Sequence, residues 1–156
     1  VGRIVDEYRK TDEDQLPVEI CVDVIGIGAG VADRLRELGL PCLAVNVAES
    51  AAVDDKFSRL RDELWWRGRT WFEARDVHIP AGCEKLIGEL TTVTYDFASS
   101  GKLVVESKRE MRKRGLPSPN QADAFLNTFA TIDRKRERDR LPRWRSNNNG
   151  GSAWAA

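Results

Sequence analysis

Residues 18–38 constrain the fold of this chain more than any other stretch. They begin with an alternating run, Val18-Glu-Ile-Cys-Val-Asp-Val24, which predicts a β-strand with one apolar face and one mixed face. Glycines follow at positions 26, 28 and 30, where side chains would obstruct a tight turn. Apolar residues at 32, 35 and 38 then recur at helical spacing, and a second, parallel strand is expected at 43–47. The pattern predicts an α/β fold.

Asp23 lies near the end of the first predicted strand. Open α/β sheets bind ligands at the carboxyl ends of their strands, so Asp23 is a candidate site residue. A strand, a Gly-x-Gly turn and a helix also describe a dinucleotide-binding fold, with Glu49 at the distance of a ribose-binding acid. Val31 stands where the third glycine of that fingerprint is needed, and counting from Gly28 does not restore the match. A further alternative is an ordinary strand–helix turn, in which the glycines only avoid steric clashes and bind no ligand.

Periodicity predicts the remaining elements. Apolar residues at helical spacing indicate helices at the start of the chain, at 53–67 and around 86–90. Two alternating runs, 91–97 and 102–106, predict a β-hairpin at the edge of the sheet or the rim of an active site. The aromatic residues that crowd the end of the second helix are expected to pack, without a role in the site: Trp65, Trp66, Trp71 and Phe72.

The last predicted helix begins at 118. Ser118 suits the N-cap, Pro119 suits the first helical position, and Gln121 completes a capping box. Asp123 stands one turn into this helix. Because the helix dipole stabilises a carboxylate there, Asp123 is either a surface acid at the helix start or a site residue.

Charge and cysteine content narrow the classes of function. Basic and acidic residues balance at 25 each, but basic residues gather at 108–114 and 134–145. Those runs predict either a face that binds a polyanion or a solvated surface. The chain has three cysteines, an odd number without close spacing, so we expect reduced thiols in an intracellular protein. With one histidine and no Cys-x-x-Cys, no structural zinc site is expected. No apolar run approaches the roughly 20 residues of a membrane span, so a soluble protein without a membrane partner is expected.

The sequence at the two ends of the chain predicts an incomplete domain and a basic tail. A helix that leads straight into a parallel strand suggests that opening strands of the sheet precede it, so residues 1–132 are expected to form an N-terminally incomplete domain. Residues 133–156 are expected to be a basic, flexible tail, since alternating charges give way to serine, asparagine and glycine. Trp154 near its end suggests a segment that docks on a partner.

Asp23 and Asp123 are expected to converge on one crevice at the C-terminal edge of the sheet. Two carboxylates without histidine or cysteine suit a hard divalent ion such as Mg²⁺ or Mn²⁺. Such ions, paired about 4 Å apart, activate water and stabilise the leaving oxygen in phosphodiester cleavage. The basic run at 108–114 would then hold the DNA backbone.

Several motifs occur in a specific order: Val22-Asp-Val-Ile-Gly-Ile-Gly-Ala-Gly-Val-Ala-Asp-Arg-Leu35, then Ile79-Pro80, then Val105-Glu-Ser-Lys-Arg-Glu-Met-Arg-Lys-Arg-Gly115 leading into Ser118-Pro-Asn-Gln-Ala-Asp-Ala124. Together they resemble the C-terminal nuclease domain of the large terminase subunit of tailed phages or prophages. The resemblance covers nearly the whole chain. It implies an RNase H-like fold, in which helices flank a central mixed sheet and a carboxylate cluster binds two Mg²⁺ or Mn²⁺ ions.

The resemblance also implies roles for individual residues. The family's strand acid falls on Asp23 and its late-helix acid on Asp123, so both are expected to be catalytic metal ligands. Lys108 falls on a lysine near the metal site, where it would contact phosphate or orient water. DNA binding is expected from the basic run: Lys108, Arg109, Arg112, Lys113 and Arg114.

The implied function is a two-metal-ion endonuclease that cuts concatemeric viral DNA during genome packaging. Its expected partners are double-stranded viral DNA, the portal protein, the small terminase subunit and an N-terminal ATPase domain of the same full-length chain. Its expected location is the cytoplasm of the infected bacterial host.

Two departures from the family pattern bear on activity. The first metal-binding aspartate of the family lies on an opening strand that is absent here, and Asn120 stands where the family often carries an acid. With two of the expected carboxylates, this polypeptide alone is expected to bind metal weakly and to cut DNA poorly. One alternative is a module that docks on DNA or the portal without catalysis. Another is a nucleotide-binding domain, which rests on the glycine loop alone.

Overall fold

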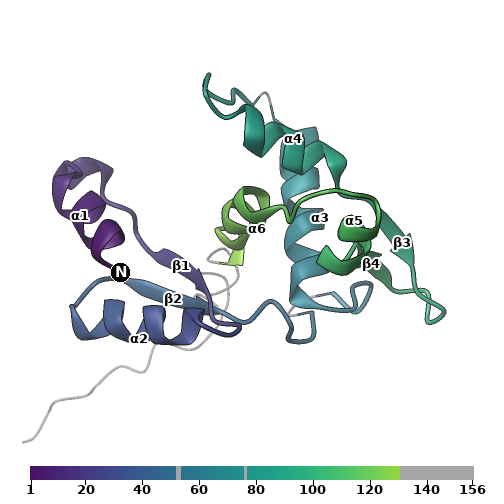
Figure 1. Cartoon of the computed structure of the whole chain (residues 1–156), viewed down its shortest axis with the longest axis horizontal. Helices are drawn as coiled ribbons and strands as arrows, with labels where there is room; N and C mark the ends of the chain where they lie inside the picture. Colours follow the sequence, from purple (N-terminus) through teal and green to yellow (C-terminus); the bar gives the residue numbers. More distant parts are fainter. Residues whose placement is uncertain (52–53, 76, 131–156) are drawn as a thin grey trace, which may run out of the picture.

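The computed structural model describes residues 1–51, 54–75 and 77–130 (Figure 1). Its helices are α1 (Gly2–Lys10), a short 3-10 helix (Glu13–Gln15), α2 (Gly28–Glu37), α3 (Leu60–Glu73), α4 (Glu84–Thr92), α5 (Lys108–Lys113) and α6 (Asn120–Asn127). Its strands are β1 (Ile20–Asp23), β2 (Cys42–Val45), β3 (Tyr95–Phe97) and β4 (Leu103–Val105). Helices and strands alternate in the first half of the chain, as the sequence predicts.

The predicted unit of strand, turn, helix and parallel strand is confirmed. β1 pairs in parallel with β2, with Asp23 opposite Val45, and α2 packs against both strands. Two glycines are needed for the turn between β1 and α2. Gly26 has a φ of 70°, which favours glycine, and a Cβ at Gly28 would lie 1.7 Å from the carbonyl oxygen of Asp23. Gly30 lies in open space, so the turn does not depend on it.

β3 and β4 form the predicted antiparallel hairpin, with Tyr95 opposite Val105. Within the described residues, however, this hairpin and the parallel pair are two separate two-stranded sheets. On its other side, β4 is joined to the segment before α3, because Leu103 forms an isolated parallel bridge with Phe57. The mixed α/β class is therefore confirmed, whereas the single mixed sheet expected for an RNase H-like fold is not observed in this part of the chain.

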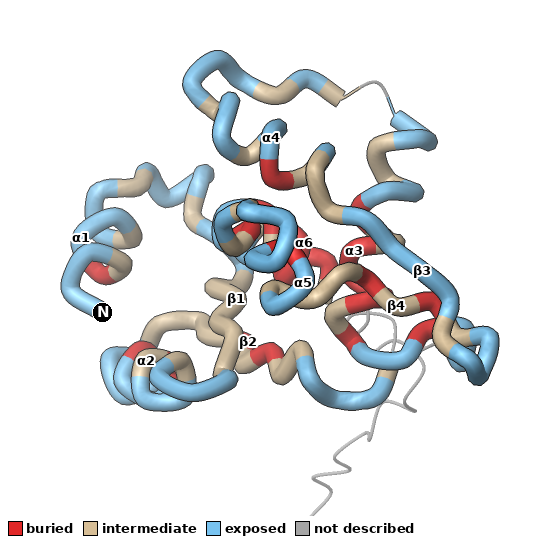
Figure 2. Tube along the Cα trace, turned by 45° about the vertical axis from the view of Figure 1, so that its right-hand side comes forward, coloured by how far each residue is buried: buried red, intermediate tan, exposed pale blue. Residues whose placement is uncertain are grey.

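The main hydrophobic core joins β2, α3, β4 and α6 (Figure 2). Leu64 of α3 and Leu126 of α6 are almost fully buried, and burial of each such side chain stabilises the fold by about 1.5–3 kcal/mol. Gly68 allows these two helices to approach closely, since a Cβ there would lie 2.1 Å from the Cδ2 atom of Leu126. The packing of α3 against α6 consequently sets which side chains of the two helices meet.

The predicted helix 53–67 is wrong at both ends, and each error has a tertiary cause. The N–H of Leu103 donates to the carbonyl oxygen of Lys56 at 2.7 Å, so the segment before α3 runs along β4 instead of forming helix. At the other end α3 continues to Glu73. There Trp71 packs edge-on against Phe129, at 5.8 Å between ring centroids.

The predicted cap of the last helix is also wrong. α6 begins at Asn120, with Pro119 at the N-cap and no hydrogen bond from a capping side chain there. Instead, Glu89 of α4 accepts hydrogen bonds from the N–H groups of Gln121, at 2.7 Å, and Ala122, at 2.9 Å. A buried carboxylate from another helix replaces the expected local capping box.

Three further expectations concern the cysteines, membrane spans and the C-terminal tail. The cysteines are free thiols, and burial, followed by the charges of Glu19 and Cys42, raises the pKa of Cys21 to about 11. No helix in the described part of the chain is long and apolar enough to cross a membrane. The expected tail, residues 133–156, lies outside the described residues, together with its basic run and Trp154.

Candidate metal centre

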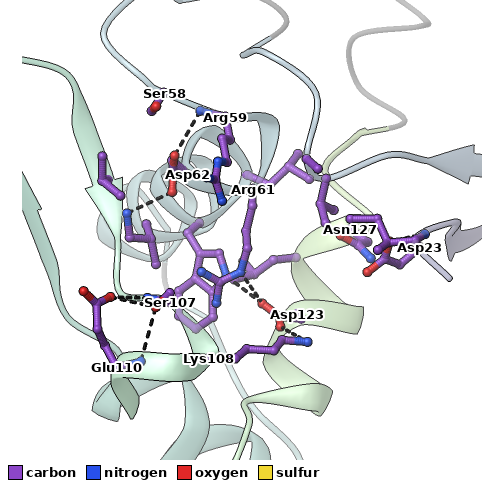
Figure 3. A pocket seen from close by; sticks show the side chains of 18 residues that line it. Asp23, Ser58, Arg59, Arg61, Asp62, Ser107, Lys108, Glu110, Asp123 and Asn127 are labelled. Atoms are coloured by element: carbon purple, nitrogen blue, oxygen red, sulfur yellow. Dashed lines mark hydrogen bonds and ion pairs between the residues drawn. The ribbon is translucent and has the colours of Figure 1, made fainter. Parts of the chain in front are cut away.

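A cleft of about 670 Å³ is bordered by side chains from β1, α3, β4, α5 and α6 (Figure 3). The three residues expected to be catalytic, Asp23, Lys108 and Asp123, all line it. None of the glycines of the β1–α2 turn does, although Ile25 of the same loop belongs to the wall. The structure thus gathers the predicted acids and the lysine in one place, beside the turn and not within it.

Asp23 reaches the cleft because of the alternation along β1. Cys21 packs against the hydrophobic core, and Asp23, two residues further, shares that face of the strand. α6 contacts β1, so this face looks toward the helix that carries Asp123. Asp23 is half-buried, and its Oδ1 atom accepts a hydrogen bond from the N–H of Ile25 at 3.0 Å, which holds the carboxylate at the strand end.

Asp123 is surrounded by donors and is only 17% exposed. Its Oδ1 atom accepts hydrogen bonds from Nε of Arg61, at 3.1 Å, and Nε1 of Trp65, at 2.9 Å. The Nζ atom of Lys108 forms an ion pair with Oδ2 at 3.0 Å, although Oδ2 has no partner with hydrogen-bond geometry in the described chain. Asp123 is therefore not an exposed surface acid, and its role in a functional site stays a prediction.

Two other acids of the cleft accept hydrogen bonds from nearby backbone N–H groups. Asp62, 2% exposed, accepts hydrogen bonds from the N–H groups of Arg59, at 3.0 Å, and Val105, at 2.9 Å. Glu110 accepts from the N–H of Ser107, at 2.9 Å, and from its hydroxyl, at 2.8 Å. These hydrogen bonds lower the pKa of Glu110. Both acids therefore organise the local backbone, with their oxygens already used as hydrogen-bond acceptors.

The capping box formed by Ser107 and Glu110 also sets where the basic helix α5 begins. Next to it, Glu106 pairs with Arg114 at 2.6 Å and accepts hydrogen bonds from Thr94. Burial alone would raise the pKa of Glu106, but the hydrogen bonds from Arg114 and Thr94 outweigh it, so the pKa is lowered. This ionised carboxylate ties the hairpin to the end of α5.

The basic run at 108–114 divides into two groups. Lys108 and Arg114 are paired with Asp123 and Glu106. Arg109, Arg112 and Lys113 are exposed and form no ion pair within the part of the chain that the structure describes. Nε of Arg112 donates a hydrogen bond to the carbonyl oxygen of Lys108. The second group is the part of the run that is open to a polyanion beside the cleft.

Sequence reasoning missed three residues of this site. Arg61 and Trp65 contact Asp123, against the expectation that the aromatic cluster has no role there. Asn127 is 6% exposed, lines the cleft and lies beside Asp23 (Figure 3). The available signal was the spacing of four residues between Arg61 and Trp65, and between Asp123 and Asn127, which places each pair on one helix face.

The donor set of the cleft is small for a metal centre. In residues 1–51, 54–75 and 77–130, no group of three or more histidine, cysteine, aspartate or glutamate side chains could hold an ion. The carboxylates of Asp23 and Asp123 are hard oxygen donors, which suits Mg²⁺, Mn²⁺ or Ca²⁺ and disfavours zinc. The position of the Lys108 ammonium shows that Asp123 already attracts a cation.

Comparison with known proteins adds an independent observation. No protein-family model and no curated protein matches the chain. Solved structures of the nuclease domain of the large terminase subunit of bacterial virus Sf6 do match. That domain is 25% identical, with a TM-score of 0.55, over 73% of this chain and 65% of the other. The predicted resemblance to a terminase nuclease domain is confirmed.

Variants of the same viral domain match equally well. A lysine-to-alanine variant solved with manganese is 25% identical, with a TM-score of 0.58, over 73% of this chain and 66% of that one. A variant domain solved with calcium is 24% identical, with a TM-score of 0.56. The present chain spans about two thirds of the length of these terminase nuclease domains.

Proposed function

We propose that this chain is the nuclease domain of a phage packaging terminase and cuts double-stranded viral DNA with divalent metal ions. The observation that carries the proposal is that Asp23 and Asp123, far apart in the sequence, line the same cleft. The likeness to terminase nuclease domains solved with manganese and calcium supports it. An RNase H-like arrangement, completed by segments that the described residues do not contain, belongs to the same proposal.

The residues of the cleft fit a hard divalent ion, Mg²⁺ or Mn²⁺. Asp23 and Asp123 would hold it, and the Oδ2 atom of Asp123 is the oxygen that now attracts the Lys108 ammonium. A pair of such ions supplies an activated water and stabilises the leaving oxygen in phosphodiester hydrolysis. Because two carboxylates are few for this task and Lys108 competes for one of them, we expect weak metal binding and slow cutting by this polypeptide alone.

The remaining residues of the site would bind and orient the DNA. Lys108, once released from Asp123, would contact a phosphate or orient the attacking water. Arg109, Arg112 and Lys113 project from α5 next to the cleft and would bind the DNA backbone. The portal, the small terminase subunit, an ATPase domain of the same chain and a location in the cytoplasm of the infected host follow as proposals from the resemblance.

The test is cleavage of supercoiled plasmid with Mn²⁺ or Mg²⁺. The chain and an N-terminally extended version are compared with their Asp23→Ala and Asp123→Ala variants. Loss of a metal ligand should reduce cutting by more than about 100-fold, since even outer-sphere partners of metal sites contribute 10- to 100-fold. Asp33→Ala is the matched control, because Asp33 is 70% exposed on α2 and pairs with Arg36 away from the cleft.

Two outcomes would overturn the proposal. One is cutting that survives both aspartate substitutions. The other is an extended protein that folds normally but is inert, which would mean that the two aspartates do not form a nuclease site. If that inert protein still retards DNA in gels, the function becomes DNA docking without catalysis, for which the exposed basic residues of α5 are the supporting observation.

A further inference from the structure

Two side chains of α3 donate to the same oxygen of Asp123. Nε of Arg61 lies 3.1 Å and Nε1 of Trp65 lies 2.9 Å from Oδ1. The two donors are one helical turn apart, so both face α6, which carries Asp123. With two donors on one oxygen, the carboxylate cannot rotate without breaking both hydrogen bonds.

The donors are themselves held in place. Nη1 of Arg61 donates to the carbonyl oxygen of Glu106 at 2.9 Å, which anchors the guanidinium to the end of β4. The Cζ atom of Arg61 lies 5.4 Å from the centre of the Trp65 ring, a cation–π contact. Trp65 is 9% exposed and belongs to the core cluster. The orientation of Asp123 is thus tied to the packing of α3, β4 and α6.

We propose that Arg61 and Trp65 are positioning residues of the metal site, which hold Asp123 by Oδ1 so that Oδ2 is the oxygen presented to the cation. The inference rests on the proposed function, because it assumes that Asp123 binds metal. The ion pair supports it, since the Lys108 ammonium lies 3.0 Å from Oδ2 while both donors of α3 bind Oδ1.

Trp65→Phe tests this role cleanly. Phenylalanine keeps an aromatic ring in the core but lacks the N–H donor, and the substitution changes no charge. A change in metal affinity would therefore report the orientation of Asp123 and not the electrostatics of the cleft. Groups that orient metal ligands typically contribute 10- to 100-fold to affinity, so we expect Trp65→Phe to weaken Mn²⁺ binding about tenfold.

The measurement is a Mn²⁺ titration followed by the broadening of backbone amide signals around Asp23 and Asp123 in NMR spectra of the full chain. This readout does not require DNA cutting and detects weak sites. Trp71→Phe is the matched control, because Trp71 lies on the same helix but packs against Phe125 and Phe129, outside the lining of the cleft. Its Mn²⁺ affinity should equal that of the parent.

The variants separate failure of this inference from failure of the proposed function. If Asp123→Asn loses Mn²⁺ binding while Trp65→Phe binds as the parent does, the positioning role is wrong and the metal site stands. If Asp123→Asn binds Mn²⁺ normally, the metal site itself is wrong. Should Trp65→Phe not fold, Arg61→Lys keeps the charge but loses the forked donors, and the same weakening is expected; unchanged binding there overturns the inference.

Discussion

At the scale of single residues, Asp123 carries more interactions than any other acid of the cleft. Arg61, Trp65 and Lys108 all contact its carboxylate. The first two are buried or nearly so, whereas the side chain of Lys108 is 43% exposed. Lys108 is therefore the partner that can leave when a metal ion or a phosphate arrives, and the other two are the partners that stay.

Substitution of Lys108 tests this difference. Lys108→Met keeps the aliphatic stem but removes the charge that competes for Oδ2 of Asp123. Partly exposed ion pairs contribute up to about 1 kcal/mol, so Mn²⁺ should bind up to roughly fivefold more tightly, while DNA cutting should fall if the lysine contacts phosphate. Calorimetry and plasmid cleavage measure the two effects.

The control for this prediction is Lys85→Met, an exposed lysine of α4 that does not line the cleft. It should leave both Mn²⁺ affinity and cutting unchanged. Weaker Mn²⁺ binding by Lys108→Met would contradict the competition between the lysine and the metal.

At the scale of elements, α6 depends on a carboxylate that another helix supplies. Glu89 of α4 is 7% exposed and satisfies two N–H groups at the start of α6, those of Gln121 and Ala122. Its negative charge also complements the positive end of the helix dipole. Since Asp123 follows within the same turn, this contact between α4 and α6 supports the geometry of the cleft.

Glu89→Ala should destabilise the protein by about 1–3 kcal/mol, because it leaves buried N–H donors without an acceptor. Thermal unfolding measures the loss, and hydrogen exchange should show faster exchange at the amides of Gln121 and Ala122. Glu37→Ala is the control, because the Glu37 side chain is 63% exposed and, among the described residues, pairs only with Arg34 of the same helix. A Glu89 variant as stable as that control would contradict the capping role.

At the scale of the whole molecule, the exposed basic side chains belong to α5, the helix whose Lys108 and Glu110 line the cleft that holds the acids. Such an arrangement suits a long polyanion that crosses the basic helix and brings one phosphate to the acids. Each phosphate contact contributes about 0.9 to the slope of log affinity against log salt concentration on B-DNA. Replacing Arg109, Arg112 and Lys113 by glutamine should thus reduce the slope by up to about 2.7.

Salt-dependent DNA binding, followed by fluorescence anisotropy, measures that slope. The control replaces three exposed basic residues of α1, Arg3, Arg9 and Lys10, by glutamine and changes the net charge equally. If both triple variants lower the slope alike, binding reflects net charge and the α5 face is only solvated surface.

Local periodicity was enough to predict much of this fold from sequence. The alternation along β1, the spacing of apolar residues in α2 and the turn residues between β3 and β4 each depend on neighbours within a few positions. Those regularities reflect backbone geometry, which every residue of a segment experiences directly. For the same reason Asp23 could be assigned to a strand end and Asp123 to the first turn of a helix.

What the sequence by itself determined was the identity of these elements, the placement of the acids on them and the resemblance to a terminase nuclease domain. Only the tertiary structure decided the separation of the two sheets and the start of α3 beside β4. The same holds for the capping of α6 by Glu89 and for the hydrogen bonds from Arg61 and Trp65 to Asp123. These depend on contacts between residues far apart in the chain, where no short-range periodicity constrains the partner. The close packing of α3 against α6 at Gly68, for example, brings Arg61 and Trp65 to Asp123.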